Sequence, residues 1–283
     1  MSSVRSGRAV IFASLTVMAY DYVCTLEKEI NYVWKQPFMM GCLLFYINRY
    51  LPFVVLMLAI SIMLPDVDPE TCYVRFKVIC CLVMLSFIVS QIILILRTYA
   101  MWGRKRWVLI CLLCTGVFCL SPSIVITLAV VVPALHFEPV RIDGPGCRVT
   151  AASNLIAVPY LLILISETVV VGLTLVRTYK YLRYSNSTWI HQLHQQGLLF
   201  YGYMFIITIS NTIYPFLVPS HQKNNLAMIQ HMAHSLLCSR VIFLILEQRE
   251  KLTMTHATTV PNRSLVLSTV MFDGDGDVSL ADI

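Results

Sequence analysis

The sequence is poor in charged residues. Asp, Glu, Lys and Arg make up 13% of its 283 residues, whereas 58% are hydrophobic, and a soluble domain has about 25% charged residues. So few charges cannot cover a surface that faces water, and they also argue against a disordered chain. With only 11 glycines, a collagen-like repeat is excluded too. The composition therefore predicts an integral membrane protein.

Catalytic motifs are missing as well. The sequence contains no G-x-S-x-G, no P-loop and no H-E-x-x-H. Asp21 is the only aspartate in an apolar stretch, and the last apolar stretch has no lysine, which argues against an aspartyl protease and a retinal Schiff base. The C-terminal FDGDGDVSLADI fits a calcium loop poorly, because Met271 takes the first ligand position. We expect no enzyme activity, no cofactor, no metal site and no nucleic-acid partner.

Seven apolar stretches are long enough for an α-helix to cross about 30 Å of hydrocarbon. Barrel strands alternate apolar and polar residues, but VICCLVMLSFIVSQIILIL is apolar on every side. The sequence predicts an all-α fold, a seven-helix transmembrane bundle over 9–246, between a short N-terminus (1–8) and a disordered tail (247–283). The expected spans are 9–26, 38–64, 78–96, 108–135, 154–176, 198–218 and 226–246.

The first stretch has some features of a signal peptide. Arg5 and Arg8 precede a short apolar run, as they would in a cleaved signal. The run continues past Asp21, however, and no small-residue cleavage site follows Tyr20. We expect the first helix to be retained as a signal anchor.

The loops carry unequal numbers of basic residues. The side with the N-terminus has seven, and the other side has twelve, namely Lys28, Lys35, Arg97, Arg104, Lys105, Arg106, Arg177, Lys180, Arg183, Arg249, Lys251 and Arg263. The positive-inside rule places the richer side in the cytoplasm. We expect the N-terminus outside and the C-terminus cytoplasmic, in the plasma membrane or an endomembrane. The basic inner loops are then candidate contacts for a cytoplasmic partner or anionic lipid.

Most of the ten cysteines lie inside the predicted helices. Only Cys72 and Cys147 lie in loops, and both loops are on the predicted outer side. Because that side is oxidising, a disulfide between Cys72 and Cys147 is possible. The alternative is two free thiols.

Four ionisable residues lie at membrane depth: Asp21, Arg49, Glu167 and Arg240. A buried charge in a membrane needs a partner, so each one marks a candidate site. Neighbouring helices and opposite signs predict an ion pair between Asp21 and Arg49, acting as structural glue or as half of a switch. Glu167 could be protonated, could hydrogen-bond Asn211 or Gln91, or could face a ligand, and Arg240 could reach the headgroups unaided.

Two histidines, His231 and His234, are three residues apart in the last stretch. That spacing places them on one helix face and would suit metal ligation, but no third ligand is evident. Polar contacts between helices are the preferred interpretation.

The stretch YDYVCTLEKEINYVWKQPFMMGCLLFYINRYLPF resembles the N-terminal signature of a mushroom-forming (basidiomycete) fungal family of multi-pass membrane proteins, domain of unknown function 6533. LRTYAMWGRKR and HSLLCSRVIFLILEQRE resemble later segments of the same family, although Gln196 replaces its usual aspartate. The residues that carry the first likeness are Asp21, Thr25, Leu26, Glu29, Trp34, Leu44, Phe45, Asn48, Arg49 and Tyr50. The resemblance implies a seven-helix membrane protein and supplies no activity.

Two classes of function remain after these exclusions. Seven helices, an outer N-terminus and basic inner loops favour receptor-like sensing or signalling. Asp21, Arg49 and Glu167 could instead line the path of a small-molecule or ion transporter. An odd number of helices and the lack of an obvious repeated half argue mildly against transport.

Overall fold

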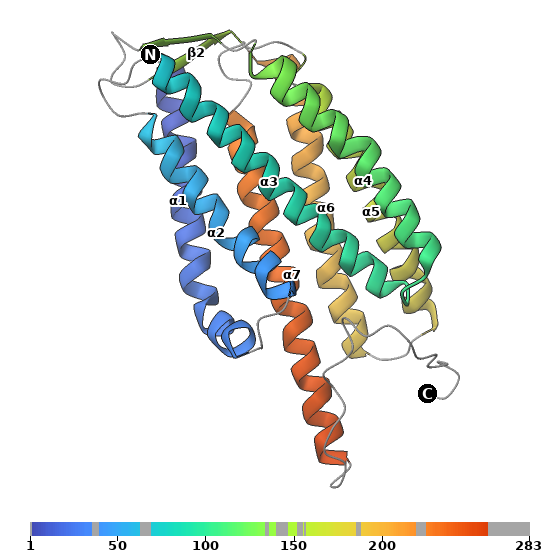
Figure 1. Ribbon diagram of the computed structural model, residues 1–283. Coiled ribbons are helices and arrows are strands. Elements are labelled where there is room, and N and C mark those ends of the chain that lie inside the picture. The colour runs from blue at the N-terminus through green and yellow to red at the C-terminus, as the bar shows by residue number, and fades with distance from the viewer. Residues whose placement is uncertain are drawn as a thin grey trace. The chain divides into compact units, whose positions relative to one another are not determined.

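The computed structural model contains seven long α-helices (Figure 1). It describes residues 2–35, 40–62, 69–133, 136–139, 147–151, 155, 157–184, 188–218 and 225–259. The chain divides into two units, Met1–Leu244 and Ile245–Ile283. The helices are α1 (Ser2–Glu29), α2 (Met40–Ser61), α3 (Pro69–Met101), α4 (Arg106–Ile126), α5 (Ala157–Tyr184), α6 (Thr188–Leu217) and α7 (Asn225–Thr259).

These helices confirm the predicted all-α bundle and its membrane character. Six of them are long and apolar enough to cross a membrane. Their outer faces carry large hydrophobic side chains such as Phe118, which is 75% exposed, as expected for surfaces that contact lipid tails. In the described residues, α6 does not meet the same measure of length and hydropathy. Its predicted crossing over 198–218 and the orientation of the termini stay predictions.

The last helix is longer than expected. α7 continues beyond the predicted span to Thr259. The prediction of a disordered tail over 247–283 is therefore wrong for 247–259, where the chain is helical. Residues 260–283 lie outside the described residues.

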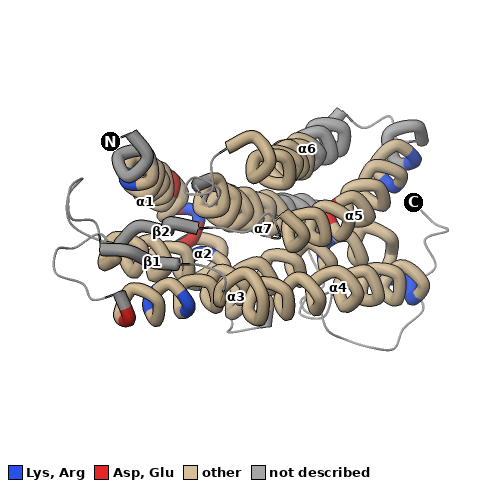
Figure 2. The backbone as a smooth tube through the Cα atoms, turned by 90° about the horizontal axis from the view of Figure 1, so that it is seen from above, with Lys and Arg blue, Asp and Glu red and all other residues tan. Residues whose placement is uncertain are grey.

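Within the first unit, α7 lies in the middle of the bundle (Figure 2). Half of its apolar window is buried, compared with 17% for α4 at the periphery. One hydrophobic cluster packs Met232 of α7 against Met18 of α1 and Leu56 of α2. A second cluster joins α7 to α3, α4, α5 and α6 through Leu94, Trp102, Val108, Leu112, Val170, Tyr201, Met204 and Cys238. α7 therefore contributes side chains to both hydrophobic clusters.

α1 ends in a π-helical turn, η1 (Ile30–Trp34). Such turns carry one extra residue per turn and rotate the side chains that follow. A second π-helical turn, η2 (Thr127–Val131), follows α4, whose Pro122 cannot donate a backbone hydrogen bond. η1 extends the helical segment eight residues beyond the predicted end at Leu26.

A two-stranded antiparallel ribbon lies in the connection between α4 and α5. β1 (His136–Pro139) pairs with β2 (Cys147–Ala151), with His136 opposite Ala151 and Pro139 opposite Cys147. The ribbon was not expected from the sequence, since strands of four and five residues leave little periodicity to recognise.

The turn between α3 and α4 is fixed by its backbone and by α5. Gly103 and Arg104 have φ of 62° and 57°, and glycine adopts this left-handed conformation without steric cost. Arg177 of α5 donates from Nε to the Met101 carbonyl at 2.8 Å, and Trp102 donates to the Leu173 carbonyl at 3.2 Å. These bonds tie α5 to the end of α3.

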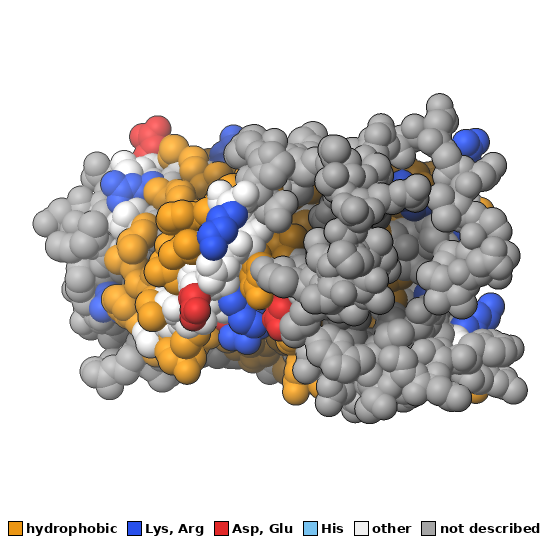
Figure 3. Space-filling view, turned by 90° about the horizontal axis from the view of Figure 1, so that it is seen from below, with side chains coloured by type: hydrophobic (Ala, Val, Ile, Leu, Met, Phe, Trp, Pro, Cys, Tyr) orange, Lys and Arg blue, Asp and Glu red, His pale blue; other side chains and the backbone are white. Residues whose placement is uncertain are grey.

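The turn between α3 and α4 and the end of α1 lie at the same end of the bundle, which we call the basic end. It carries the exposed side chains of Lys28, Lys35, Arg104, Lys105 and Arg106. Viewed from this end, basic and acidic side chains lie among hydrophobic ones (Figure 3). A mixed surface of this kind suits the headgroup layer.

Candidate functional site

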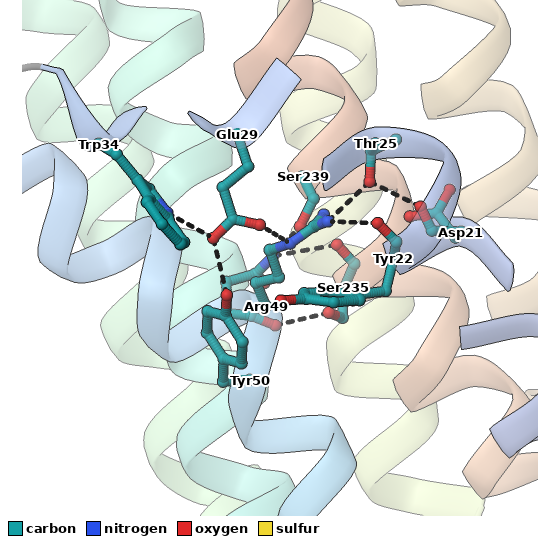
Figure 4. A network of polar contacts seen from close by, with 10 residues as sticks. Asp21, Tyr22, Thr25, Glu29, Trp34, Arg49, Tyr50, Ser235 and Ser239 are labelled. Carbon is teal, nitrogen blue, oxygen red and sulfur yellow. Dashed lines mark hydrogen bonds and ion pairs between the residues drawn. The ribbon is translucent and has the colours of Figure 1, made fainter. Parts of the chain in front are cut away.

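A buried ion pair joins α1 and α2 near the basic end. Arg49 Nε lies 2.7 Å from Glu29 Oε2, and the two side chains are 4% and 0% exposed. Arg49 NH2 also donates to Thr25 Oγ1 at 2.6 Å (Figure 4). Asp21, Thr25 and Glu29 share one face of α1, because residues four apart are neighbours on a helix. Arg49 thus meets a polar stripe of α1 rather than a single partner.

Aromatic rings cover the rest of the guanidinium. Arg49 Cζ lies 5.1 Å from the centroid of Tyr22, 5.7 Å from Phe45 and 5.3 Å from Phe243. A cation over an aromatic face is attracted by the ring quadrupole, and more strongly where water is excluded. The rings belong to α1, α2 and α7, so the positive charge helps to hold three helices together.

Glu29 accepts two further hydrogen bonds through Oε1. Tyr50 donates from its hydroxyl at 2.7 Å, and Trp34 donates from its indole nitrogen at 3.3 Å. The π-helical turn η1 brings Trp34 back towards Glu29, five residues earlier. With Arg49 on its other oxygen, this carboxylate has partners on both sides, as a buried charge requires.

Asp21 pairs with α7, not with α2. Arg240 donates from Nε and NH2 to Asp21 Oδ1 at 2.9 and 2.6 Å. Asp21 is 6% exposed and Arg240 is 47% exposed, so the guanidinium extends towards the lipid or headgroup side. The predicted pair of Asp21 with Arg49 is therefore wrong, and Arg240, for which no partner was expected, has one in Asp21. Glu29, which the sequence reasoning placed beyond the membrane span, takes the role given to Asp21.

Asn48 connects α2 to α3 and α7. Its Nδ2 donates to the Ser235 carbonyl at 3.0 Å and to Ser239 Oγ at 3.1 Å. Its Oδ1 accepts from Ser90 Oγ at 2.8 Å, and Ser235 Oγ donates to the Asn48 carbonyl. All four residues are buried. We call this set, together with Asp21, Thr25, Glu29, Arg49 and Arg240, the Arg49 network.

A second group of buried polar side chains lies on α3, α5 and α7. His234 Nε2 is 3.0 Å from Glu167 Oε1, and both side chains are at most 3% exposed. Phe87 of α3 packs against the two histidines of α7, with ring centroids 5.0 Å from His234 and 6.2 Å from His231. Glu167 therefore faces a histidine, and the expectation of an Asn211 or Gln91 partner is wrong.

Several atoms of this second group have no hydrogen-bond partner in the described part of the chain. They are both carboxylate oxygens of Glu167, both ring nitrogens of His234, His231 Nε2 and both polar atoms of the Gln91 side chain, although Glu167 Oε1 and His234 Nε2 lie 3.0 Å apart as an ion pair. Asn211 instead donates to the Leu226 carbonyl, and Gln230 donates to Thr208. We call Glu167, His234, His231, Gln91 and Phe87 the Glu167 cluster.

Metal binding finds no support in the described ranges. They contain no group of three or more His, Cys, Asp or Glu side chains placed to hold a metal ion. His231 and His234 share a helix face, as expected, but Phe87 rather than a third ligand lies against them.

Cys72 takes part in a disulfide and is fully buried at the start of α3. The side chain of its predicted partner, Cys147, lies outside the described residues. The other cysteines whose side chains the structure describes are not in disulfides: Cys24, Cys42, Cys80, Cys81, Cys111, Cys114, Cys119 and Cys238. The oxidised state of Cys72 agrees with a location on an oxidising side.

The predicted partner can be identified by peptide mapping. Digestion of alkylated, unreduced protein should yield one cross-linked species that contains Cys72 and Cys147, because β2 begins at Cys147 and β1 of the same ribbon packs on α3. Reduction before alkylation should abolish it, and the peptide with Cys111 and Cys114 serves as an uncross-linked control. An alkylated Cys147 in the unreduced sample would disprove the pairing.

Comparison with known proteins gives one partial match. Residues 9–54 match the model of a family of unknown function (DUF6533). No curated protein matches the chain. The matched segment contains α1 from Ala9, η1 and most of α2, and so includes Asp21, Thr25, Glu29, Asn48 and Arg49. The part of the chain that resembles this uncharacterised domain family is therefore the part that supplies the α1 and α2 side of the Arg49 network.

Proposed function

We propose that the protein is a receptor-like sensor without catalytic activity, in which α7 changes position relative to the other helices. The observation that carries this proposal is the set of polar contacts made by α7. It contacts α1 through Arg240, α2 through Ser235 and Ser239, α5 through His234, and α6 through Gln230. A helix held by discrete hydrogen bonds and ion pairs shifts between alternative arrangements instead of deforming gradually.

Two consecutive stretches of α7, 230–234 and 235–240, differ in how completely their polar groups are paired. Near the basic end, Arg240, Ser235 and Ser239 all have partners. Towards the other end, His231, His234 and Gln230 keep unpaired atoms. Unsatisfied groups could accept a ligand, and paired groups could act as the latch that responds to it. This arrangement supports sensing in the first stretch and a response in the stretch that follows it.

The orientation forms part of the proposal. The exposed residues of the basic end include Lys28, Lys35 and 104–106, so the positive-inside rule assigns this end to the cytoplasm. The N-terminus is then outside and the basic end is available to a cytoplasmic partner or to anionic lipid. The resemblance of 20–53 to a mushroom-forming fungal family supports a fungal origin.

A transporter is the alternative, and the Glu167 cluster is the observation that favours it. A buried carboxylate next to a histidine is the kind of group that carries protons or cations across membranes. The alternative predicts flux through the protein. Proteoliposomes that contain it would then dissipate a pH gradient faster than empty liposomes.

The sensing proposal is tested by breaking the ion pair between Arg240 and Asp21. Replacing Arg240 with Gln removes the charge that pairs with Asp21, and it should increase hydrogen exchange in peptides that cover the basic end of α7 by about fivefold, for a loss of about 1 kcal/mol. Exchange in α4, which Arg240 does not contact, should stay unchanged. The measurement is hydrogen exchange with mass spectrometry on the full chain in nanodiscs.

Lys35→Gln is the matched control, because Lys35 is an exposed basic residue at the same end. It should leave α7 exchange at the wild-type level. Equal hydrogen exchange in Arg240→Gln and wild type would show that the pair of Arg240 with Asp21 does not hold α7 in place. Accelerated loss of a pH gradient in proteoliposomes would favour the transporter instead.

A further inference from the structure

The Glu167 cluster has hydrogen-bonding capacity that the protein itself does not use. Glu167, His231, His234 and Gln91 are each at most 3% exposed. Seven of their polar atoms lack a hydrogen-bond partner in the described ranges, and two of the seven, Glu167 Oε1 and His234 Nε2, form the ion pair. Buried polar groups in proteins are nearly always paired, and each exception calls for an explanation such as a bound ion or ligand. Such capacity points to something that binds there.

The members of the cluster face a common region. Glu167 and His234 are in direct contact across α5 and α7. Phe87 lies against both histidines, and Gln91 is four residues further along α3, on the same helix face. Helices α5 and α7 therefore place polar groups beside one aromatic ring of α3, and Gln91 lies one turn of α3 away from that ring.

The unused atoms are mostly hydrogen-bond acceptors. With Glu167 ionised, both of its oxygens are acceptors, as is Gln91 Oε1, and a neutral imidazole adds one acceptor nitrogen. The cluster then carries a charge of −1 when both histidines are neutral. A fitting ligand supplies several donors and one positive charge.

A primary ammonium ion meets both requirements. It has three N–H donors and one charge, and the face of Phe87 is attractive to a cation. Alkali and alkaline-earth ions prefer a shell of oxygen ligands, which two imidazoles do not provide. Quaternary ammonium ions have no N–H group to donate, and anions are repelled by the carboxylate.

We propose that Glu167, His234, His231 and Gln91 form a binding site for a small primary ammonium ion, with Glu167 as its counter-ion and Phe87 beside it. The assignment rests on the proposed sensing function and names the class of ligand that would be sensed. Because two of the binding residues belong to α7, occupation of the site would bias the position of that helix.

The test uses propylammonium as the probe and thermal unfolding of the full chain in detergent as the measurement. Propylammonium chloride at neutral pH should raise the midpoint temperature with a saturable dependence on concentration. Propanol, tetramethylammonium chloride and sodium chloride should not, because each lacks the charge, the N–H donors or both. A wild-type protein without a saturable shift, or one that responds equally to tetramethylammonium, would overturn the proposal.

Variants then locate the site. Glu167→Gln keeps the shape of the side chain but removes the counter-charge, so the affinity for propylammonium should fall by about thirtyfold or more. Glu27→Gln, at an exposed position of α1, is the matched control and should bind as wild type does. If Glu167→Gln does not fold, Gln91→Leu should weaken binding instead, and wild-type affinity in the folded variant would overturn the site.

The propylammonium binding test and the Arg240→Gln exchange test can each fail while the other succeeds. Propylammonium that binds without changing hydrogen exchange in α7 would leave the site intact and remove the sensing function. A normal response of α7 to Arg240→Gln without propylammonium binding would do the reverse.

Discussion

Replacing Glu29 with Gln should destabilise the protein by about 3–5 kcal/mol, the usual cost of leaving a buried charge without its partner. Gln retains an oxygen that can accept from Tyr50 and Trp34, so those two bonds need not be lost. What disappears is the charge opposite Arg49, whose side chain is only 4% exposed. The large expected effect therefore reports on the ion pair itself.

The measurement is unfolding of purified protein, monitored by helical circular dichroism during titration with denaturing detergent. Glu27→Gln removes the same charge two residues earlier, at an exposed position, and should change the unfolding free energy little. Equal stabilities for the two variants would show that the pair of Glu29 with Arg49 does not hold α1 to α2.

A double variant separates the effect of an unpaired charge from the effect of lost side-chain packing. Glu29→Gln combined with Arg49→Met leaves no unpaired charge, while Met fills part of the volume and keeps contact with Tyr22, Phe45 and Phe243. Replacement of a buried ion pair by neutral groups of similar size is often tolerated. We expect the double variant to regain most of the stability lost by either single change, and additive losses would contradict the pairing.

The helices could be predicted because their signal is local. A run of about 20 apolar residues predicts a membrane helix by itself, whatever the rest of the chain contains. The error at the end of α1 has the same origin. Glu27, Lys28 and Glu29 look like the polar end of a span, whereas the chain stays helical through Trp34. Glu29 is consequently buried at the level of Arg49.

A signal for this arrangement was present in the sequence. Asp21, Thr25 and Glu29 recur every four residues, which is the spacing of one helix face. Because these three residues share a helix face, each of them is a candidate partner for a buried arginine on the next helix. Which of the three pairs with the arginine depends on where α1 ends. Hydropathy does not determine the end of the helix.

The contacts of α7 could not be predicted in the same way. The pairs of Asp21 with Arg240 and of Glu167 with His234 join residues that are 219 and 67 positions apart. Spacing within one helix carries no information about which other helix faces it. Only the arrangement of the bundle, with α7 in its middle (Figure 2), brings these residues together.

Asn48→Leu should lower the unfolding free energy by about 2–3 kcal/mol. The amide makes three side-chain hydrogen bonds, to the Ser235 carbonyl, Ser239 and Ser90. Each such bond contributes about 0.6–1 kcal/mol inside a membrane protein. Leu has a similar length and no polar group, so the hydroxyls of Ser90 and Ser239 would lose the bonds that they make to Asn48.

The control is Asn31→Leu, because Asn31 is exposed and its side-chain oxygen accepts a hydrogen bond from Lys35 Nζ at 2.9 Å. It should stay within about 0.5 kcal/mol of wild type. A double-mutant cycle then tests the contact directly. Ser90→Ala should cost about 0.5–1 kcal/mol in the wild-type background and almost nothing beside Asn48→Leu. If Ser90→Ala costs the same in both backgrounds, the two side chains act independently, and Asn48 does not join α3 to α7.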